Sequence, residues 1–131
     1  MKKDRVLNPH ICRAIAEIGH TEYLVIGDAG LPIPAGVKVI DVSVTRGVPG
    51  FIEVLEAIAE ELVIESFIFA SEAVEANPGL VSMMKAIIPD KPSKTVTHDE
   101  FKTIVKDAKT IIRTGECSSF ANVILVCGVN F

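Results

Sequence analysis

The stretch GHTEYLVIGDAGLPIP, residues 19–34, decides how the surrounding chain folds. Within it, Tyr23 to Gly27 is a short apolar run typical of a strand. Asp28 follows directly, and the glycine and proline residues beyond it cannot continue a strand, so they predict a shaped loop. The sequence therefore places an acidic side chain at the point where a strand ends.

A helix is expected just before this stretch. Asn8 suits the N-cap, Pro9 the first helical position, and Gly19 the end of the helix. His20 should therefore emerge at a helix C-terminus. Because ligands bind beyond the carboxyl ends of strands in open α/β sheets, we expect both His20 and Asp28 to lie where chemistry takes place.

Strands and helices are predicted to alternate along the rest of the chain. The expected strands cover 37–44, 65–70, 94–97, 110–113 and 122–128, and the expected helices 51–62, 78–88 and 101–108. Asn77 and Pro78 repeat the capping signature of the first helix. Thr97 pairs with Glu100 as a capping box. This alternation predicts an α/β protein, a single layered domain over residues 1–131 with a central, largely parallel or mixed sheet flanked by helices.

The composition restricts the classes of function. A net charge of −4 and a pI near 5.3 argue against a nucleic-acid partner, because phosphate binding requires clustered cations. No apolar stretch approaches the roughly 20 residues of a membrane helix, so we expect a cytoplasmic protein without membrane insertion. The chain is 49% hydrophobic, more than a monomer of this size needs, which predicts a homo-oligomer.

The cysteines and glycines carry no cofactor motif. Cys12, Cys117 and Cys127 are odd in number and lack Cys-x-x-Cys spacing, which argues against a disulfide framework or a structural zinc site. Cys117 adjoins the candidate site, but no base for it can be identified, so we do not expect it to be a nucleophile. Neither a Gly-x-Gly-x-x-Gly nor a P-loop pattern is present, and no nucleotide cofactor is expected.

Two histidines and one aspartate are candidate site residues. His20 suits general acid or base catalysis, since imidazole titrates nearest neutrality, whereas its structural alternative is a helix C-cap. His98 can face the same sheet edge as Asp28, and its alternative is a partly exposed histidine beside a capping threonine. Asp28 could bind substrate hydroxyls or orient His20, and its alternative is an Asx turn that holds the loop.

A third group of polar residues precedes the last predicted strand. Burying Arg113, Glu116 and the segment 118–122 there would be costly unless these groups are paired or face a cleft. Two histidines and an aspartate also suggest a metal site, but their spacing matches no ligand motif such as His-Glu-x-x-His.

Several separated motifs resemble the D-ribose pyranase branch of the ribose and fucose mutarotase family. They are His20, Gly27-Asp28-Ala29-Gly30-Leu31-Pro32, Thr97-His98-Asp99-Glu100-Phe101-Lys102, Ile112-Arg113-Thr114-Gly115-Glu116 and Ala121-Asn122, in this order and spacing. The similarity covers the whole chain, and it implies that His20 is the proton donor. The substrate-binding residues that it implies are Asp28, His98, Phe120, Ala121 and Asn122.

The resemblance further implies an enzyme that interconverts the β-pyranose and β-furanose forms of D-ribose by acid/base ring opening and reclosure. It implies no metal or other cofactor, and a homodecamer of two stacked pentameric rings. The family usually has tyrosine where this chain has Phe120, which removes a phenolic hydroxyl. The alternatives are a fucose-type mutarotase of the same family and a non-catalytic sugar-binding protein associated with ribose uptake. The loop Asp28–Pro32 looks more like the ribose branch.

Overall fold

The computed structural model describes residues 1–131. Its strands are β1 (Tyr23–Gly27), β2 (Lys38–Asp41), β3 (Ile64–Ala70), β4 (Ser93–Val96), β5 (Thr110–Arg113) and β6 (Val123–Cys127). Its helices are α1 (Pro9–Glu17), α2 (Phe51–Ala59), α3 (Glu72–Ala76), α4 (Pro78–Ile87), α5 (His98–Ile104) and the 3₁₀ turn η1 (Val105–Asp107). None of these helices has the length and apolar character that crossing a membrane requires.

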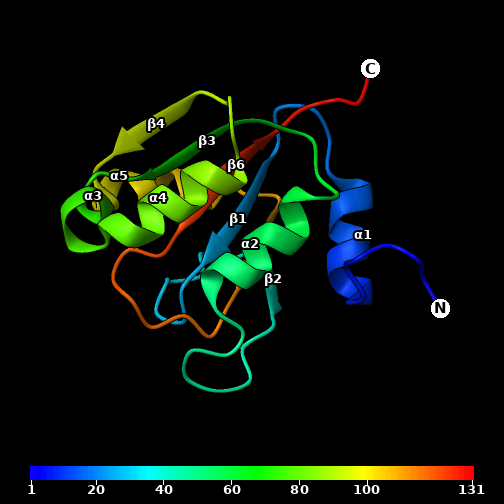
Figure 1. Ribbon diagram of the computed structural model, residues 1–131, viewed down its shortest axis with the longest axis horizontal. Coiled ribbons are helices and arrows are strands. Elements are labelled where there is room, and N and C mark those ends of the chain that lie inside the picture. The colour runs from blue at the N-terminus through cyan, green and yellow to red at the C-terminus, as the bar shows by residue number, and fades with distance from the viewer.

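All six strands form one sheet in the order β2-β5-β1-β6-β3-β4 (Figure 1). β6 lies antiparallel between β1 and β3, whereas the other neighbouring strands are parallel. The predicted α/β fold with a mixed sheet is therefore confirmed. Because β6 alone runs in the opposite direction, the loop before β6 lies at the same edge as the carboxyl ends of the other five strands.

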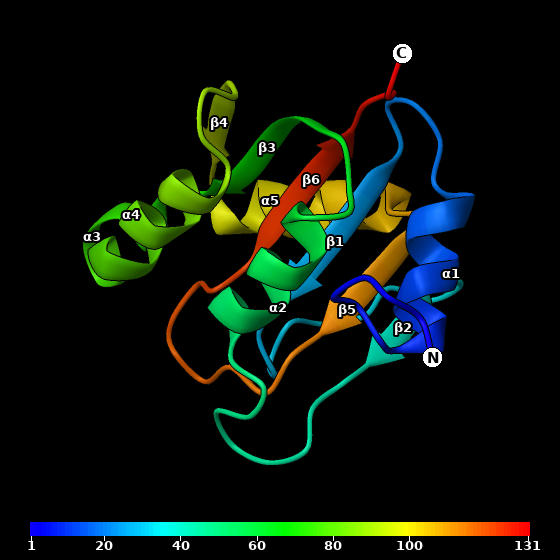
Figure 2. The same cartoon turned by 45° about the vertical axis from the view of Figure 1, so that its right-hand side comes forward.

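Helices cover both faces of the sheet (Figure 2). α1, α2 and α4 pack on one face over the larger core, which includes Leu24 and Ile26 of β1. α5 packs on the opposite face, where Phe101 joins a second core that includes Val25. Alternate residues of β1 thus point to opposite faces, and both faces are apolar because both are covered.

Two of the predicted helix starts are confirmed in detail. The side chain of Asn8 accepts hydrogen bonds from the backbone N–H groups of His10 and Ile11, so Asn8 is the N-cap of α1. Thr97 and Glu100 form the predicted capping box at the start of α5. Each cap satisfies backbone donors that the first turn of a helix leaves without partners.

Three features differ from the sequence-based expectations. The second strand is shorter than 37–44, because β2 pairs with β5 only over Lys38–Asp41. The side chain of Asn77 makes no capping hydrogen bond to α4 and instead contacts residues 118–119. The pattern did not predict α3, whose five residues are too few to display a helical period.

Candidate functional site

The carboxyl edge of the sheet carries a cavity of about 280 Å³. Three segments line it: the loop after β1, the start of α5 and the loop before β6. The lining residues are Asp28, Gly30, Leu31, His98, Ser119, Phe120 and Asn122. This volume lies near the lower end of the range for small-molecule pockets, which suits a ligand with few non-hydrogen atoms. Four of the predicted site residues therefore lie together, while Ala121 is fully buried beside them.

Asp28 and Asn122 form a reciprocal pair in this cavity. Asn122 Oδ1 accepts the backbone N–H of Asp28 at 2.9 Å, and Asn122 Nδ2 donates to Asp28 Oδ2 at 2.8 Å. Asp28 Oδ1 also accepts the N–H of Gly30 at 2.9 Å, so the Asx turn considered as its alternative is present. The pair retains bonding capacity, since a carboxylate offers about four acceptor sites and the amide has a second N–H.

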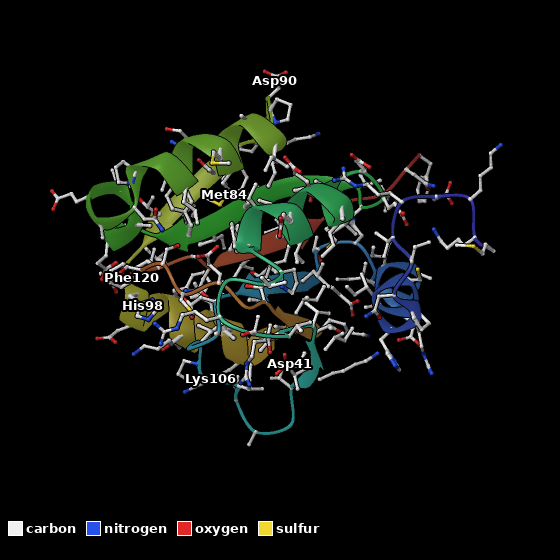
Figure 3. The ribbon with its side chains drawn as sticks, turned by 60° about the horizontal axis from the view of Figure 1, so that its bottom comes forward. Asp41, Met84, Asp90, His98, Lys106 and Phe120 are labelled. Carbon is white, nitrogen blue, oxygen red and sulfur yellow. The ribbon has the colours of Figure 1, made fainter.

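His98 and Phe120 meet edge to face, with ring centroids 5.1 Å apart and an interplanar angle of 75° (Figure 3). The Nδ1 atom of His98 is buried and has no hydrogen-bond partner, which is uncommon in folded proteins. Phe120 has a φ of +56°, a left-handed conformation that strains a residue other than glycine. Such strain is concentrated at functional sites.

Glu116 holds the loop before β6 against its neighbours. Its carboxylate accepts hydrogen bonds from the backbone N–H groups of Phe51, Cys117 and Ser118 at 3.0–3.2 Å. Its backbone carbonyl accepts the N–H of Ala29, in the loop after β1. Burial raises the pKa of Glu116, but the hydrogen bonds outweigh burial, and the pKa lies below its ordinary value. Glu116 is therefore a structural anchor that joins two of the segments lining the cavity.

His20 lies at the other end of the sheet, so the expectation that it shares an edge with Asp28 was wrong. His20 precedes β1 and Asp28 follows β1, whose five residues span roughly 16 Å. The backbone N–H of Thr21, next to His20, donates to the carbonyl of Cys127 at the end of β6. The connection from α1 to β1 accordingly lies beside the C-terminus, far from the loop before β6 (Figure 2). The cavity of a single chain therefore lacks this histidine.

A tight and well-anchored turn presents His20. Thr21 has a φ of +66°, in the left-handed region. The carboxylate of Glu22 accepts the N–H of Gly19 at 2.8 Å and pairs with the ammonium of Lys109 at 3.1 Å. These two contacts, the backbone hydrogen bond first, lower the pKa of Glu22. The contacts of Gly19 and Glu22 thus fix the turn on both sides of His20.

Glu65 is the partner of the imidazole. His20 Nε2 lies 3.3 Å from Glu65 Oε2, and about half of each side chain is exposed. A carboxylate at this distance can orient an imidazole by accepting a hydrogen bond from its ring N–H. The C-cap alternative does not apply, because Ile18 caps α1. Sequence analysis missed Glu65 because no local motif joins the start of β3 to the turn after α1.

Arg113 and Cys117 lie near the cavity without lining it. Arg113 Nη1 lies 3.4 Å from Asp41 Oδ2, at the carboxyl ends of β5 and β2. Cys117 is exposed, and its Sγ contacts only the carbonyl of Gly115, so no base activates it. Burial raises the pKa of the Cys127 thiol to about 11. No three His, Cys, Asp or Glu side chains gather closely enough to hold a metal ion.

The pattern of the RbsD / FucU transport protein family matches residues 1–130. The chain belongs to this family. A D-ribose pyranase of Bacillus licheniformis is 45% identical over 131 residues, and one of Laribacter hongkongensis is 44% identical over 131 residues. Both alignments cover 100% of this chain and 100% of the relative. The family resemblance inferred from the motifs is confirmed.

Two solved structures have the same fold. The structure of Bacillus subtilis RbsD complexed with D-ribose matches with a TM-score of 0.96 and 41% identity, covering 100% of each chain. The fucose mutarotase from Streptococcus pneumoniae in complex with L-fucose matches with a TM-score of 0.85 and 23% identity, also covering 100% of each chain. Within the RbsD / FucU family, this chain is thus close in both sequence and structure to a ribose-binding member, and the second match concerns the fold alone.

Proposed function

We propose that this protein is a D-ribose pyranase, which interconverts the β-pyranose and β-furanose forms of D-ribose. The observation that carries the proposal is the polar cavity in which Asp28 and Asn122 retain unused hydrogen-bonding capacity. Full-length relatives of 44–45% identity carry this name. A sugar with several hydroxyl groups is the kind of small ligand that such a cavity can bind.

The chemistry requires little more than proton transfer. Ring opening protonates the ring oxygen while the anomeric hydroxyl gives up its proton, and the bond between the anomeric carbon and the ring oxygen breaks. The resulting aldehyde is then attacked by the hydroxyl one carbon nearer, which closes the five-membered ring. We assign the proton donor to His20, because a positioned general acid contributes about 10²–10⁴-fold to such a step without a cofactor.

In this proposal, the cavity residues bind the sugar. Asp28 accepts hydrogen bonds from hydroxyl groups, Asn122 donates its second N–H, and His98 gains the partner that its ring lacks. Phe120 forms part of the apolar wall, and the buried Ala121 belongs to the core against which Phe120 packs. Holding the hydroxyl groups of the sugar in one arrangement determines which hydroxyl oxygen attacks the aldehyde and closes the ring.

We propose that a second copy of the chain supplies His20. The donor and the cavity lie at opposite ends of one sheet, so a complete site forms only where the amino edge of one copy meets the carboxyl edge of another. A head-to-tail contact of this kind joins different surfaces and closes into a ring when the rotation allows. Exposed Val44 and Val48, on the loop before α2, offer apolar surface for association. The homodecamer of two stacked pentameric rings remains the proposed assembly.

We also propose that the enzyme acts in the cytoplasm. Cys12, Cys117 and Cys127 are all free, as expected in a reducing compartment.

NMR exchange spectroscopy on labelled ribose tests the activity. The enzyme should accelerate exchange between pyranose and furanose signals, whereas a non-catalytic sugar-binding protein would leave the exchange at the buffer rate. The same assay with L-fucose tests the fucose-type alternative. Dialysis against EDTA should leave the rate unchanged, and activity restored by a divalent ion would favour a metal site.

A mixing experiment tests the shared site. His20→Ala and His98→Ala variants are unfolded together and reassembled, or co-expressed. If one site uses two chains, about a quarter of the sites in a random mixture combine an intact His20 with an intact His98. Activity should therefore return on mixing two inactive variants. If both histidines served a site within one chain, the mixture would stay inactive.

A further inference from the structure

The short helix α3 is bounded by two residues that contact the segments carrying His98 and Phe120. Only Ser71 separates α3 from the end of β3, at the same edge of the sheet as the cavity. Glu72, its first residue, and Asn77, which follows its last residue, each reach a different segment of the cavity wall. We call these two residues the α3 clamp.

Glu72 holds the segment that contains His98. Its two carboxylate oxygens both lie 3.0 Å from the backbone nitrogen of His98, whose N–H donates to them. This hydrogen bond is the largest cause of the lowered pKa of Glu72. The carboxylate is therefore ionised at neutral pH, and a charged acceptor forms the stronger hydrogen bond.

Asn77 holds the loop before β6. Its Nδ2 donates to Ser118 Oγ at 2.9 Å and to the carbonyl of Ser119 at 3.1 Å. The sequence pattern predicted that this side chain would cap α4, yet it makes no capping hydrogen bond. An asparagine before a helix normally stabilises the helix start. Here α4 lacks that capping hydrogen bond, and the Asn77 side chain binds the loop before β6 instead.

The clamp is the hydrogen-bonded connection between these two segments. No hydrogen bond joins residues 97–101 directly to residues 117–122. They meet through the rings of His98 and Phe120, 5.1 Å apart, and through the α3 clamp. The α3 clamp thus links the backbone of the segment that carries His98 to the loop that carries Phe120, independently of the ring contact.

We propose that Glu72 and Asn77 are positioning residues that set the separation of His98 and Phe120, and through it the fit of the sugar. This role rests on the proposed function. It predicts a specific kinetic pattern, because the clamp supports only the binding wall and touches neither His20 nor Glu65. Loss of the clamp should weaken substrate binding while the proton-transfer step proceeds at its usual rate in the bound state.

The first test examines the rings in the ligand-free protein. The ring-proton signals of His98, assigned by their loss in His98→Gln, report the position of Phe120 through its ring current. Glu72→Ala and Asn77→Ala should each displace these signals. Glu72→Gln keeps an acceptor oxygen and should restore them. Glu75→Ala is the matched control, since Glu75 is exposed on the same helix and makes no hydrogen bond to the cavity wall.

The second test measures ribose turnover. Glu72→Ala and Asn77→Ala should each raise KM about three- to tenfold, the factor for one lost hydrogen bond, with kcat and its pH profile unchanged. Glu75→Ala and Glu72→Gln should stay near the wild-type KM. The double variant should raise KM by less than the product of the single effects, because both act through one ring contact.

Two results would overturn the inference. One is unchanged His98 signals and an unchanged KM in both alanine variants while thermal unfolding shows them folded. The other is an equal effect of Glu75→Ala, which would indicate general weakening of α3. A wild-type protein that fails to accelerate ribose exchange would refute the proposed function alone, because the ring signals are measured without ribose.

Discussion

At the carboxyl edge of the sheet, the candidate residues Asp28 and Asn122 are hydrogen-bonded to each other. At the amino edge, His20 is positioned by its turn and by the exposed carboxylate of Glu65. Asn122 is 1% exposed and shares two hydrogen bonds with Asp28. The side chains of His20 and Glu65 are 51% and 53% exposed, and His20 does not line the cavity that contains Asp28 and Asn122. In the proposed function, the carboxyl edge supplies the binding wall and the amino edge supplies the proton donor.

Under the proposed function, this difference assigns binding to one edge of the sheet and proton transfer to the other. The binding wall is integrated into the core, so changes there should alter both affinity and stability. The pair at the amino edge is built on the surface, so changes there should alter the rate and leave the fold intact.

The largest effect is expected from His20→Ala. Removing the proton donor should lower the exchange rate by about 10²–10⁴-fold, because that is the usual contribution of a general acid. Thermal unfolding and the assembly measured by light scattering should match the wild type, since half of the His20 side chain faces solvent. Exchange at the wild-type rate in this variant would remove His20 from the mechanism. It would also contradict the proposal that the amino edge supplies the proton donor.

Asn122→Ala should affect stability and binding together. The substitution leaves the buried N–H of Asp28 without its partner, which costs about 1–3 kcal/mol of unfolding free energy. Denaturant unfolding and ribose titration measure the two effects. Glu65→Gln is the matched change at the amino edge and should stay within about 0.5 kcal/mol of the wild-type stability, as surface substitutions usually do. Equal losses in both variants would contradict the division.

Phe120→Tyr should raise the affinity of the cavity for ribose. A phenolic hydroxyl that donates one hydrogen bond to the sugar is worth about 0.5–1.5 kcal/mol, or a few-fold to roughly tenfold in affinity. Tyrosine has the same backbone requirements as phenylalanine, so the left-handed backbone at position 120 should accept it. Titration of ribose into both proteins decides the matter, and unchanged or weaker affinity would indicate that the ring acts only as an apolar wall.

The smallest effect concerns pH and Glu116. Its folded pKa lies below the ordinary value of 4.5, so the ionised carboxylate stabilises the fold above that pH. This contribution is lost as pH falls through the folded pKa. The stability advantage over Glu116→Gln should therefore be constant near neutrality and shrink below about pH 4.5. Unfolding curves at several pH values measure it, and an advantage that persists in acid would contradict the assigned ionisation.

Local signals predicted much of the fold. β1 has the predicted bounds, because an apolar run between a glycine turn and an Asp-Ala-Gly loop leaves few alternatives. Asn77 shows the limit of such signals. It carries the same capping signature as Asn8, but a partner distant in sequence takes its side chain, and tertiary contacts override local preference.

The candidate site could be predicted only in part. Asp28, His98, Phe120 and Asn122 come together because each lies at the carboxyl edge, where the end of a strand or the start of β6 places it. His20 was misplaced because it precedes a strand, so the rule for residues that follow strands does not apply to it. Glu72 and Glu65 escaped notice because their partners lie on other elements.

The position of β6 has a consequence for biosynthesis. This strand is the last of the six to leave the ribosome, yet it lies between β1 and β3 and joins the two halves of the sheet. Until residues 123–127 are available, β1 and β3 both present an unpaired edge, which is a template for wrong pairing. Folding of the nascent chain must therefore await its final strand. We expect the sheet to close only once β6 has emerged, in a slow step governed by contacts between distant parts of the sequence.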